Sequence, residues 1–300
     1  MDKTFSDANA ITRDFFEKLL LEERLMGSVV PDTSTEIFGH RFDTPITTAA
    51  LSHLGDIVEP NVESQMQAYA RGALLAGAMH FIGMSEEEGY DEVMSVEAKT
   101  VRIVKPYADE SKVEKQILRA KERGAIAVGI DIDHVFDRNG DPDVVVGELM
   151  SVKSLDRMKE YIGLTDLPFV IKGVLSVRDA LICRDIGIKG IVVSHHAGRL
   201  RYAVPPLMVL PEIRKAVGKD LTIFVDCTVA SGLDVYKAMA LGADAVSVGK
   251  HLMPILKEQG AEGVADRITE MTRELKGAMA FTGVRDTKSF DPSVIHLRNF

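Results

Sequence analysis

The feature that most constrains the fold of this chain is a regular alternation of short apolar runs with amphipathic stretches, which begins at Thr44. Each run has the length of a β-strand, and the stretches between them place apolar residues at helical spacing. In residues 110–123 the apolar side chains share one face, and Gly124 then supplies a helix stop. The same pattern recurs over residues 176–187 and 231–242. The chain is therefore predicted to build repeated strand and helix units.

Eight apolar runs are predicted to be strands. They are residues 45–49, 79–82, 101–104, 125–130, 169–171, 191–193, 221–225 and 245–248. Strands that alternate with helices form a parallel sheet, and eight of them suit a closed (β/α)8 TIM barrel. An open doubly wound sheet shares the alternation, but it would carry a GxGxxG or GxxxxGK[ST] phosphate loop, and the sequence has neither. We predict an α/β fold with a single TIM-barrel domain over residues 41–300.

An N-terminal helical extension is predicted over residues 1–40. Within it, residues 8–26 are expected to form one or two helical turns outside the barrel, covering its lower end and contributing little to function.

The composition of the chain excludes some classes of function. The chain has 300 residues, 46% of them hydrophobic, which is enough for a large core, and its net charge of -9 argues against a nucleic-acid partner. No run of about eighteen apolar residues and no signal peptide are found, so no membrane partner and a cytoplasmic location are expected. Cys183 and Cys227 lack metal-ligand spacing, and the histidines outside the 195–196 pair, His134 among them, are scattered singly. We therefore expect no metal site.

Polar residues follow the predicted strands, and a barrel brings strand ends to one mouth. The set comprises Lys105, Asp131, Asp133, Lys172, His196, Arg199, Asp226, Gly249 and Lys250. A histidine can take a proton near neutral pH, and an arginine three residues further on can hold a carboxylate bidentately, so His196 and Arg199 indicate a small organic acid as substrate. Either residue alone would be read as an ordinary loop histidine or surface cation. The set as a whole predicts an active site.

Two strand-end positions carry additional information. Lys172 brings an ammonium to the barrel mouth, where it could stabilise an anion on a cofactor or substrate. Gly249-Lys250 follows the last strand, where barrels often bind phosphate. Longer loops at 133–150 and 201–206 leave the same end, and the tract 137–143 is expected to be a flexible turn.

The chain resembles the FMN-dependent α-hydroxy acid dehydrogenase and oxidase family, which includes lactate, glycolate and mandelate oxidising enzymes. The resemblance runs from about Val30 to Leu297. Its strongest pieces are residues 32–35 with Gly39, Ile171-Lys172-Gly173-Val174, Ser194-His195-His196-Ala197-Gly198-Arg199, and residues 232–250.

The resemblance implies FMN at the barrel mouth, with Lys172 near flavin N1 and the phosphate near Gly249-Lys250. It implies that His196 is the base, that Asp133 steadies it once protonated, and that Arg199 and Lys105 bind the substrate. A carboxylate near an imidazole is expected to raise its pKa, and a lysine beside N1 to favour the anionic reduced flavin. The implied FMN contacts are Ala49, Ala50, Asp131, Lys172, Ser194, Asp226, Gly249 and Lys250. Family members are often tetramers, so a homo-oligomer is expected.

Departures from the family pattern leave alternatives open. Lys105 replaces a tyrosine, which motivates a flavin-dependent isomerase or reductase on the same barrel. Ala230 stands where the phosphate loop has an arginine, Ile103 replaces a glutamine and Gly83 a serine, which motivate a barrel that has lost FMN and acts as a scaffold. Asp131 replaces a threonine and changes the charge of the pocket. Oxidation of a lactate-like or glycolate-like 2-hydroxy acid with FMN remains the leading prediction.

Overall fold

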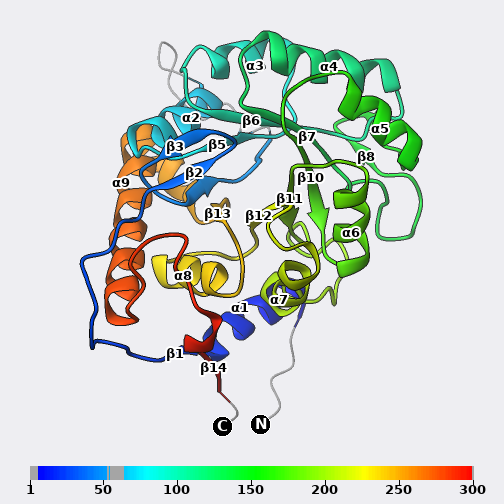
Figure 1. The fold of residues 1–300 in the computed structure, drawn as a ribbon. Coiled ribbons are helices and arrows are strands. Elements are labelled where there is room, and N and C mark those ends of the chain that lie inside the picture. Colours follow the sequence, from blue (N-terminus) through cyan, green and yellow to red (C-terminus); the bar gives the residue numbers. More distant parts are fainter. Residues whose placement is uncertain (1–5, 53, 55–63, 299–300) are drawn as a thin grey trace.

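The computed structural model describes residues 6–52, 54 and 64–298, and its centre is a barrel of parallel strands wrapped by helices (Figure 1). The barrel strands are β4 (Ile46–Thr48), β5 (His80–Ile82), β6 (Thr100–Val104), β7 (Ala127–Asp131), β10 (Phe169–Val174), β11 (Gly190–Val193), β12 (Thr222–Val225) and β13 (Ala245–Val248). Neighbours in the sheet follow chain order, and β13 pairs with β4. Parallel bridges Thr47 to Met79 and Leu51 to Ile82 join β4 to β5 and close the ring. The predicted TIM barrel, with all eight strands, is confirmed.

A helix follows each strand and packs on the outside. These helices are α2 (Gln65–Leu75), α3 (Glu87–Met94), α4 (Glu110–Glu122), α5 (Leu155–Gly163), α6 (Val177–Asp185), α7 (Pro206–Val217), α8 (Gly232–Ala240) and α9 (Leu252–Phe281). Most of these helices begin after a capping Ser or Asp residue. The side chains of Ser154, Ser176 and Ser231 each accept a hydrogen bond from the backbone N–H of the residue three positions further on. The periodicity does not predict α9, which bends at Gly260, where φ is 64°. Among the described residues no helix is long and apolar enough to span a bilayer.

The core has two apolar layers because every barrel strand is buried on both faces. One layer fills the barrel interior with side chains such as Phe81, Val170 and Phe224. The other lies between the strands and the surrounding helices, with Ile117 and Leu210 among its members. Strands that are buried on both faces have continuous apolar sequences, so these strands could be predicted from the sequence.

The N-terminal segment contacts both ends of the barrel, and the expectation that residues 8–26 cover the lower end is wrong, since α1 (Ala8–Lys18) lies at the carboxyl end. The hairpin β2 (Thr35–Ile37) and β3 (His40–Phe42) carries Phe38 against Phe224 and the start of β11, at the amino end of the barrel. Helix α1 instead contacts loops at the carboxyl end. After α1, strand β1 (Leu19–Leu21) pairs antiparallel with β14 (Ile295–Leu297), so the prediction of helical turns as far as residue 26 is wrong. That pairing involves residues far apart in sequence, which local periodicity does not show.

Candidate active site

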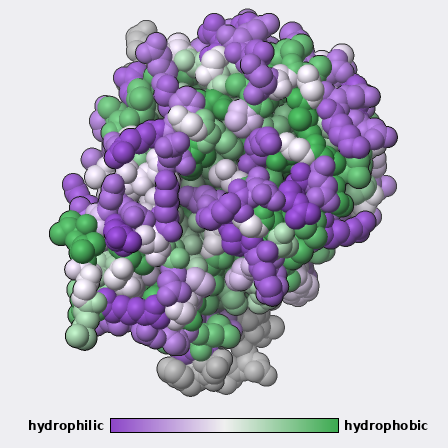
Figure 2. All heavy atoms as spheres, in the orientation of Figure 1, coloured by the Kyte–Doolittle hydropathy of each residue, from purple (hydrophilic) through white to green (hydrophobic). Residues whose placement is uncertain are grey.

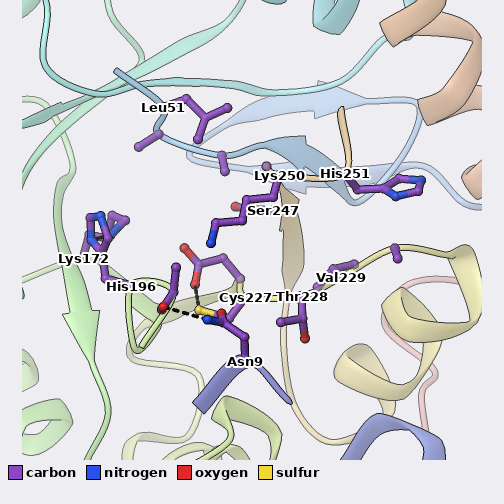
Figure 3. A pocket seen from close by; sticks show the side chains of 16 residues that line it. Asn9, Leu51, Lys172, His196, Cys227, Thr228, Val229, Ser247, Lys250 and His251 are labelled. Atoms are coloured by element: carbon purple, nitrogen blue, oxygen red, sulfur yellow. Dashed lines mark hydrogen bonds between the residues drawn. The ribbon is translucent and has the colours of Figure 1, made fainter. Parts of the chain in front are cut away.

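A cavity of about 520 Å³ opens at the carboxyl end of the barrel (Figure 3). Its lining residues lie in or just after β4, β10, β11, β12 and β13, with Asn9 added from α1. The lining comprises Asn9, Ala49, Ala50, Leu51, Lys172, His196, Ala197, Asp226, Cys227, Thr228, Val229, Ala230, Ser247, Gly249, Lys250 and His251. Lys172 and His196 lie together on one side, and Lys250 extends into the cavity from the other. Its size is that of a small-molecule or cofactor site.

A buried ionic cluster underlies one wall of this cavity. Lys105 Nζ lies 2.6 Å from Asp131 Oδ2, and Lys172 Nζ lies 3.2 Å from Asp133 Oδ2. Burial raises the pKa of Asp131, but the ammonium groups of Lys172 and Lys105 outweigh it and hold that pKa well below its usual value. Burial and the charge of Asp131 raise the pKa of Asp133 well above its usual value. One carboxylate is therefore ionised, and the other readily holds a proton.

His196 lies against this cluster. Its Nδ1 is 2.5 Å from Asp133 Oδ1 and 2.8 Å from Lys172 Nζ. Burial and the positive charge of Lys172 lower the pKa of His196 to about 3. The expected increase from the neighbouring carboxylate is therefore wrong in direction, because desolvation and the lysine outweigh it. His196 is neutral over the physiological pH range.

The backbone at His196 has an uncommon conformation. His196 and Ala197 have φ values of 46° and 54°, in the left-handed region that side chains rarely adopt. The neighbouring His195 holds the turn: its Nδ1 accepts from the Gly198 N–H at 3.1 Å, so its Nε2 donates to Thr12 Oγ1 of α1 at 2.8 Å. Left-handed non-glycine residues cluster at functional sites. His195 thus has a structural role.

The loop between β7 and α5 covers the other side of His196. It contains a small hairpin, β8 (Val144–Val145) with β9 (Glu148–Leu149). His134 Nε2 lies 2.9 Å from His196 Nε2, and His134 Nδ1 lies 2.9 Å from Asp143 Oδ2. Arg199 donates from Nη2 to Asp143 Oδ2 and to the Phe136 carbonyl, each at 2.5 Å. The predicted turn in the tract 137–143 is present, with the N–H groups of Asn139 and Asp141 donating to Asp137 Oδ1, and the tract is anchored at Asp143. His134 is not isolated.

The side chains of Asp133, His196, His134 and Asp143 form a row of three hydrogen-bonded contacts. Each contact in this row needs one proton. Burial lowers the pKa of His134 to about 4, so two neutral imidazoles supply two protons. Because the ammonium of Lys172 also donates to His196 Nδ1, the third proton belongs to Asp133, whose pKa is raised. The hydrogen bond from His134 and the charge of Arg199 lower the pKa of Asp143 against its burial. In this arrangement His196 Nε2 carries a proton and donates it to His134.

The opposite end of the cavity is suited to an anion. Lys250 supplies positive charge at that end, and the loop 226–230, which leads into α8, lines it. Arg13 of α1 binds Asp234 of α8 through two contacts of 2.8 Å. Ala230 replaces the family arginine, but Arg267 of α9 donates to the Ala230 carbonyl at 2.7 Å and to His251 Nε2 at 2.9 Å. The guanidinium of Arg267 therefore lies next to Ala230, the position at which the family pattern has an arginine.

The predicted site residues divide into two groups. Ala49, Ala50, Lys172, His196, Asp226, Gly249 and Lys250 line the cavity. Lys105, Asp131, Asp133, Ser194 and Arg199 lie outside its lining, in the ionic cluster, the turn or the loop contact. Sequence reasoning missed Asn9, His134, Asp143 and His251. His134 and His251 directly follow predicted residues, which is a usable signal, whereas Asn9 and Asp143 carry no local signal.

Four possible metal ligands also come together, contrary to the expectation of scattered ligands. Asp131, Asp133, His134 and His196 offer atoms that lie within 4.8 Å of one another. The ammonium groups of Lys105 and Lys172 lie against the two carboxyl groups, and their charges would repel a cation. We assign no metal to this group.

Comparison with known proteins identifies the family. A sequence model described as FMN-dependent dehydrogenase matches residues 6–153 and 142–297, which together cover nearly the whole chain. The chain belongs to the FMN-dependent dehydrogenase family. This membership does not favour the isomerase, reductase or scaffold alternatives.

Individual family members are similar over different lengths. L-lactate dehydrogenase of Caulobacter vibrioides is 43% identical over 129 residues, which are 43% of this chain and 34% of that protein. Glycolate oxidase of Spinacia oleracea is 28% identical over 324 residues, spanning 95% of this chain and 86% of the relative. A structure of mandelate oxidase with 3,3-difluoro-2-hydroxy-3-phenylpropionic acid superposes with a TM-score of 0.86 at 28% identity, covering 97% of this chain and 90% of that chain.

The cavity fits FMN, the cofactor of this family of dehydrogenases. Ala49, Leu51 and Val229 provide apolar walls for a ring system, and the buried ammonium of Lys172 suits an electron-rich ring edge. The ammonium of Lys250 suits a phosphate. Gly249 keeps the wall thin, since a Cβ there would lie 2.9 Å from the Ala49 Cβ.

Proposed function

We propose that the protein uses FMN to oxidise a small 2-hydroxy acid to the corresponding 2-oxo acid. The observation that carries the proposal is the 2.5 Å contact between Asp133 Oδ1 and His196 Nδ1, beside the buried Lys172 at the cavity wall. The names of the relatives, which include lactate dehydrogenase and glycolate oxidase, support this substrate class. A lactate-like or glycolate-like acid is the proposed size.

Each residue has a defined part in the proposed reaction. Arg199 binds the substrate carboxylate through its planar guanidinium. His196 accepts a substrate proton at Nε2 once its own proton lies on Nδ1, where ionised Asp133 accepts a hydrogen bond and stabilises the imidazolium. The bond between C2 and its hydrogen breaks as two electrons leave the substrate. FMN, when bound, would supply the acceptor for those two electrons and for the second hydrogen that the substrate loses.

The remaining predicted residues would hold the cofactor or adjust the charge. Lys172 would place its ammonium beside the flavin ring, and Lys250 would bind the phosphate. Ala49, Ala50, Asp226 and Gly249 would line the cofactor site. Lys105 acts on the substrate only indirectly, because its ammonium binds Asp131.

The test is product formation without oxygen. FMN-loaded protein is mixed with lactate, glycolate and larger 2-hydroxy acids, and the 2-oxo acid formed is quantified against the FMN reduced. We expect one equivalent of 2-oxo acid per FMN with at least one acid of the panel. A yellow protein that forms no 2-oxo acid with any of them contradicts the proposal.

The proposed oligomeric state rests on the resemblance to the family alone. A homo-oligomer, a tetramer by family likeness, remains a prediction, as does the cytoplasmic location.

A further inference from the structure

The two groups that the proposed function assigns to the substrate are both occupied by the protein itself. Arg199 would bind the substrate carboxylate, yet its Nη2 lies 2.5 Å from a carboxylate oxygen of Asp143. His196 Nε2 would accept the substrate proton, yet it lies 2.9 Å from His134 Nε2. The open cavity is not lined by Arg199, Asp143 or His134.

One loop supplies both occupants. His134 and Asp143 are bonded to each other at 2.9 Å, and they lie on the segment between β7 and α5. Their side chains are only 13% and 12% exposed, so the contacts are largely removed from water. A desolvated, charge-assisted contact such as that of Asp143 with Arg199 is stronger than a neutral one. The loop therefore presents a carboxylate and a hydrogen-bonding group at the spacing that these two residues require.

We propose that Asp143 and His134 are internal competitors of the substrate, which a 2-hydroxy acid must displace from Arg199 and His196 together. This inference rests on the proposed function. The carboxylate of the acid takes the place of Asp143 on the guanidinium, and its hydroxyl takes the place of His134 on Nε2. As His134 leaves, it takes the proton from His196 Nε2, and Asp133 passes its own proton to His196 Nδ1. The base therefore becomes available only when an acid with both groups is present.

The competition selects substrates by chemistry. A monofunctional carboxylate replaces Asp143 alone and leaves His134 in place, whereas a neutral alcohol replaces His134 alone and leaves Arg199 paired. Only a ligand with both groups on adjacent carbons recovers both contacts that the loop gives up. The two residues thereby determine specificity without being parts of the reacting centre.

The test is the affinity for oxalate, a two-carbon dicarboxylate that has no C–H bond to break. Its dissociation constant is measured from the change in the visible FMN spectrum, in wild type and in Asp143→Asn. Because a competitor lowers apparent affinity by the fraction of protein it occupies, removing the charge of Asp143 is expected to tighten oxalate binding about tenfold. Asp141→Asn, the same change on an exposed residue two positions away, is expected to leave it unchanged. His134→Gln is a second variant and is expected to tighten binding as well.

The outcomes separate the inference from the proposed function. If Asp143→Asn and His134→Gln both bind FMN but hold oxalate no tighter than wild type, while Arg199→Met loses oxalate, the inference is wrong and Arg199 remains the carboxylate site. If Arg199→Met binds oxalate as tightly as wild type, Arg199 is not the carboxylate site, and both the inference and the proposed substrate site are wrong.

Discussion

Asp133 decides which nitrogen of His196 carries the proton. With its raised pKa it can donate to Nδ1 when protonated, or accept from Nδ1 when ionised. Only the second state leaves Nε2 able to accept a substrate proton. The nearby Asp131 stays ionised and is bound to Lys105, so the two carboxylates have different roles although only one residue separates them.

Asp133→Asn should therefore lower the rate of flavin reduction by about a hundredfold or more, since an amide cannot ionise to hold the Nδ1 proton. FMN binding should change little, because Asp133 does not line the cavity. Stopped-flow absorbance at saturating substrate measures the rate. Asp141→Asn, a matched change on an exposed residue of the same loop, serves as the control, and an unchanged rate in Asp133→Asn would show that Asp133 does not act on His196.

Some residues of the site could be predicted from the sequence, and others could not. Lys172, His196 and Lys250 could be predicted because each follows an apolar run, and strand ends of a barrel converge. The pairing of Arg199 with Asp143 could not, because it depends on how residues 133–150 fold back over the barrel mouth. The pKa of His196 was predicted with the wrong sign for a similar reason, since burial and the contact with Lys172 are not local properties of the sequence.

At the scale of elements, α1 supports the active-site turn from outside the barrel. Asn9 donates to the Ala197 carbonyl at 2.8 Å, Thr12 binds His195, and Arg13 binds Asp234 at the start of α8. The helix thus connects the loops after β11 and β12. Its amphipathic pattern predicted a helix, but the partners of that helix lie about 190 to 220 positions further along the chain and left no local signal.

Arg13→Met should lower the free energy of unfolding by about 2 kcal/mol, because Asp234 is 3% exposed and would lose its ion partner. Chemical denaturation followed by circular dichroism measures the change. Glu17→Gln removes the other, exposed partner of Arg13 and should cost less than about 0.5 kcal/mol. Equal effects of the two substitutions would contradict the assignment of the buried pair as the one that matters.

The junction of β13 with α9 is assigned to the cofactor phosphate through Lys250. Lys250→Met should raise the dissociation constant for FMN about tenfold, the loss of one charged contact, while that for riboflavin, which has no phosphate, stays the same. Fluorescence titration of the apoprotein measures both constants. Lys257→Met, on an exposed turn of α9, is the control. A parallel loss of riboflavin affinity would place Lys250 elsewhere in the cofactor site.

At the scale of the whole molecule, the barrel was predictable because its strands are buried on both faces and its helices are amphipathic. The connections outside the barrel were not, and β1 with β14 is the clearest case. Hydrophilic side chains cover most of the face in Figure 2, and hydrophobic ones protrude where the segment between β1 and β2 runs. Met26 and Val30 of that segment are 102% and 83% exposed.

Buried neutral histidines make the stability of the fold depend on pH. Burial lowers the pKa of His80 to about 3, while in the unfolded chain it is near 6.5. Below pH 6.5 the unfolded state binds more protons, so stability falls as pH drops from there toward 3. At pH 5.5 His80 alone should cost about 1.4 kcal/mol relative to pH 7.5.

Denaturant unfolding at both pH values measures this loss. His80→Phe should show a smaller loss than wild type, and His296→Phe, at an exposed position, should show the wild-type loss. A loss that is identical in all three proteins would mean that His80 does not contribute to it.

The most direct test of the proposed function is the anaerobic reduction of bound FMN by a 2-hydroxy acid in wild type, His196→Ala and His296→Ala, followed by stopped-flow absorbance. We expect wild type and His296→Ala to be reduced at the same rate, and His196→Ala to be slower by a factor of about 10² to 10⁴ with FMN still bound. Reduction of His196→Ala at the wild-type rate would contradict the assignment of His196 as the base, and with it the proposed function of the site.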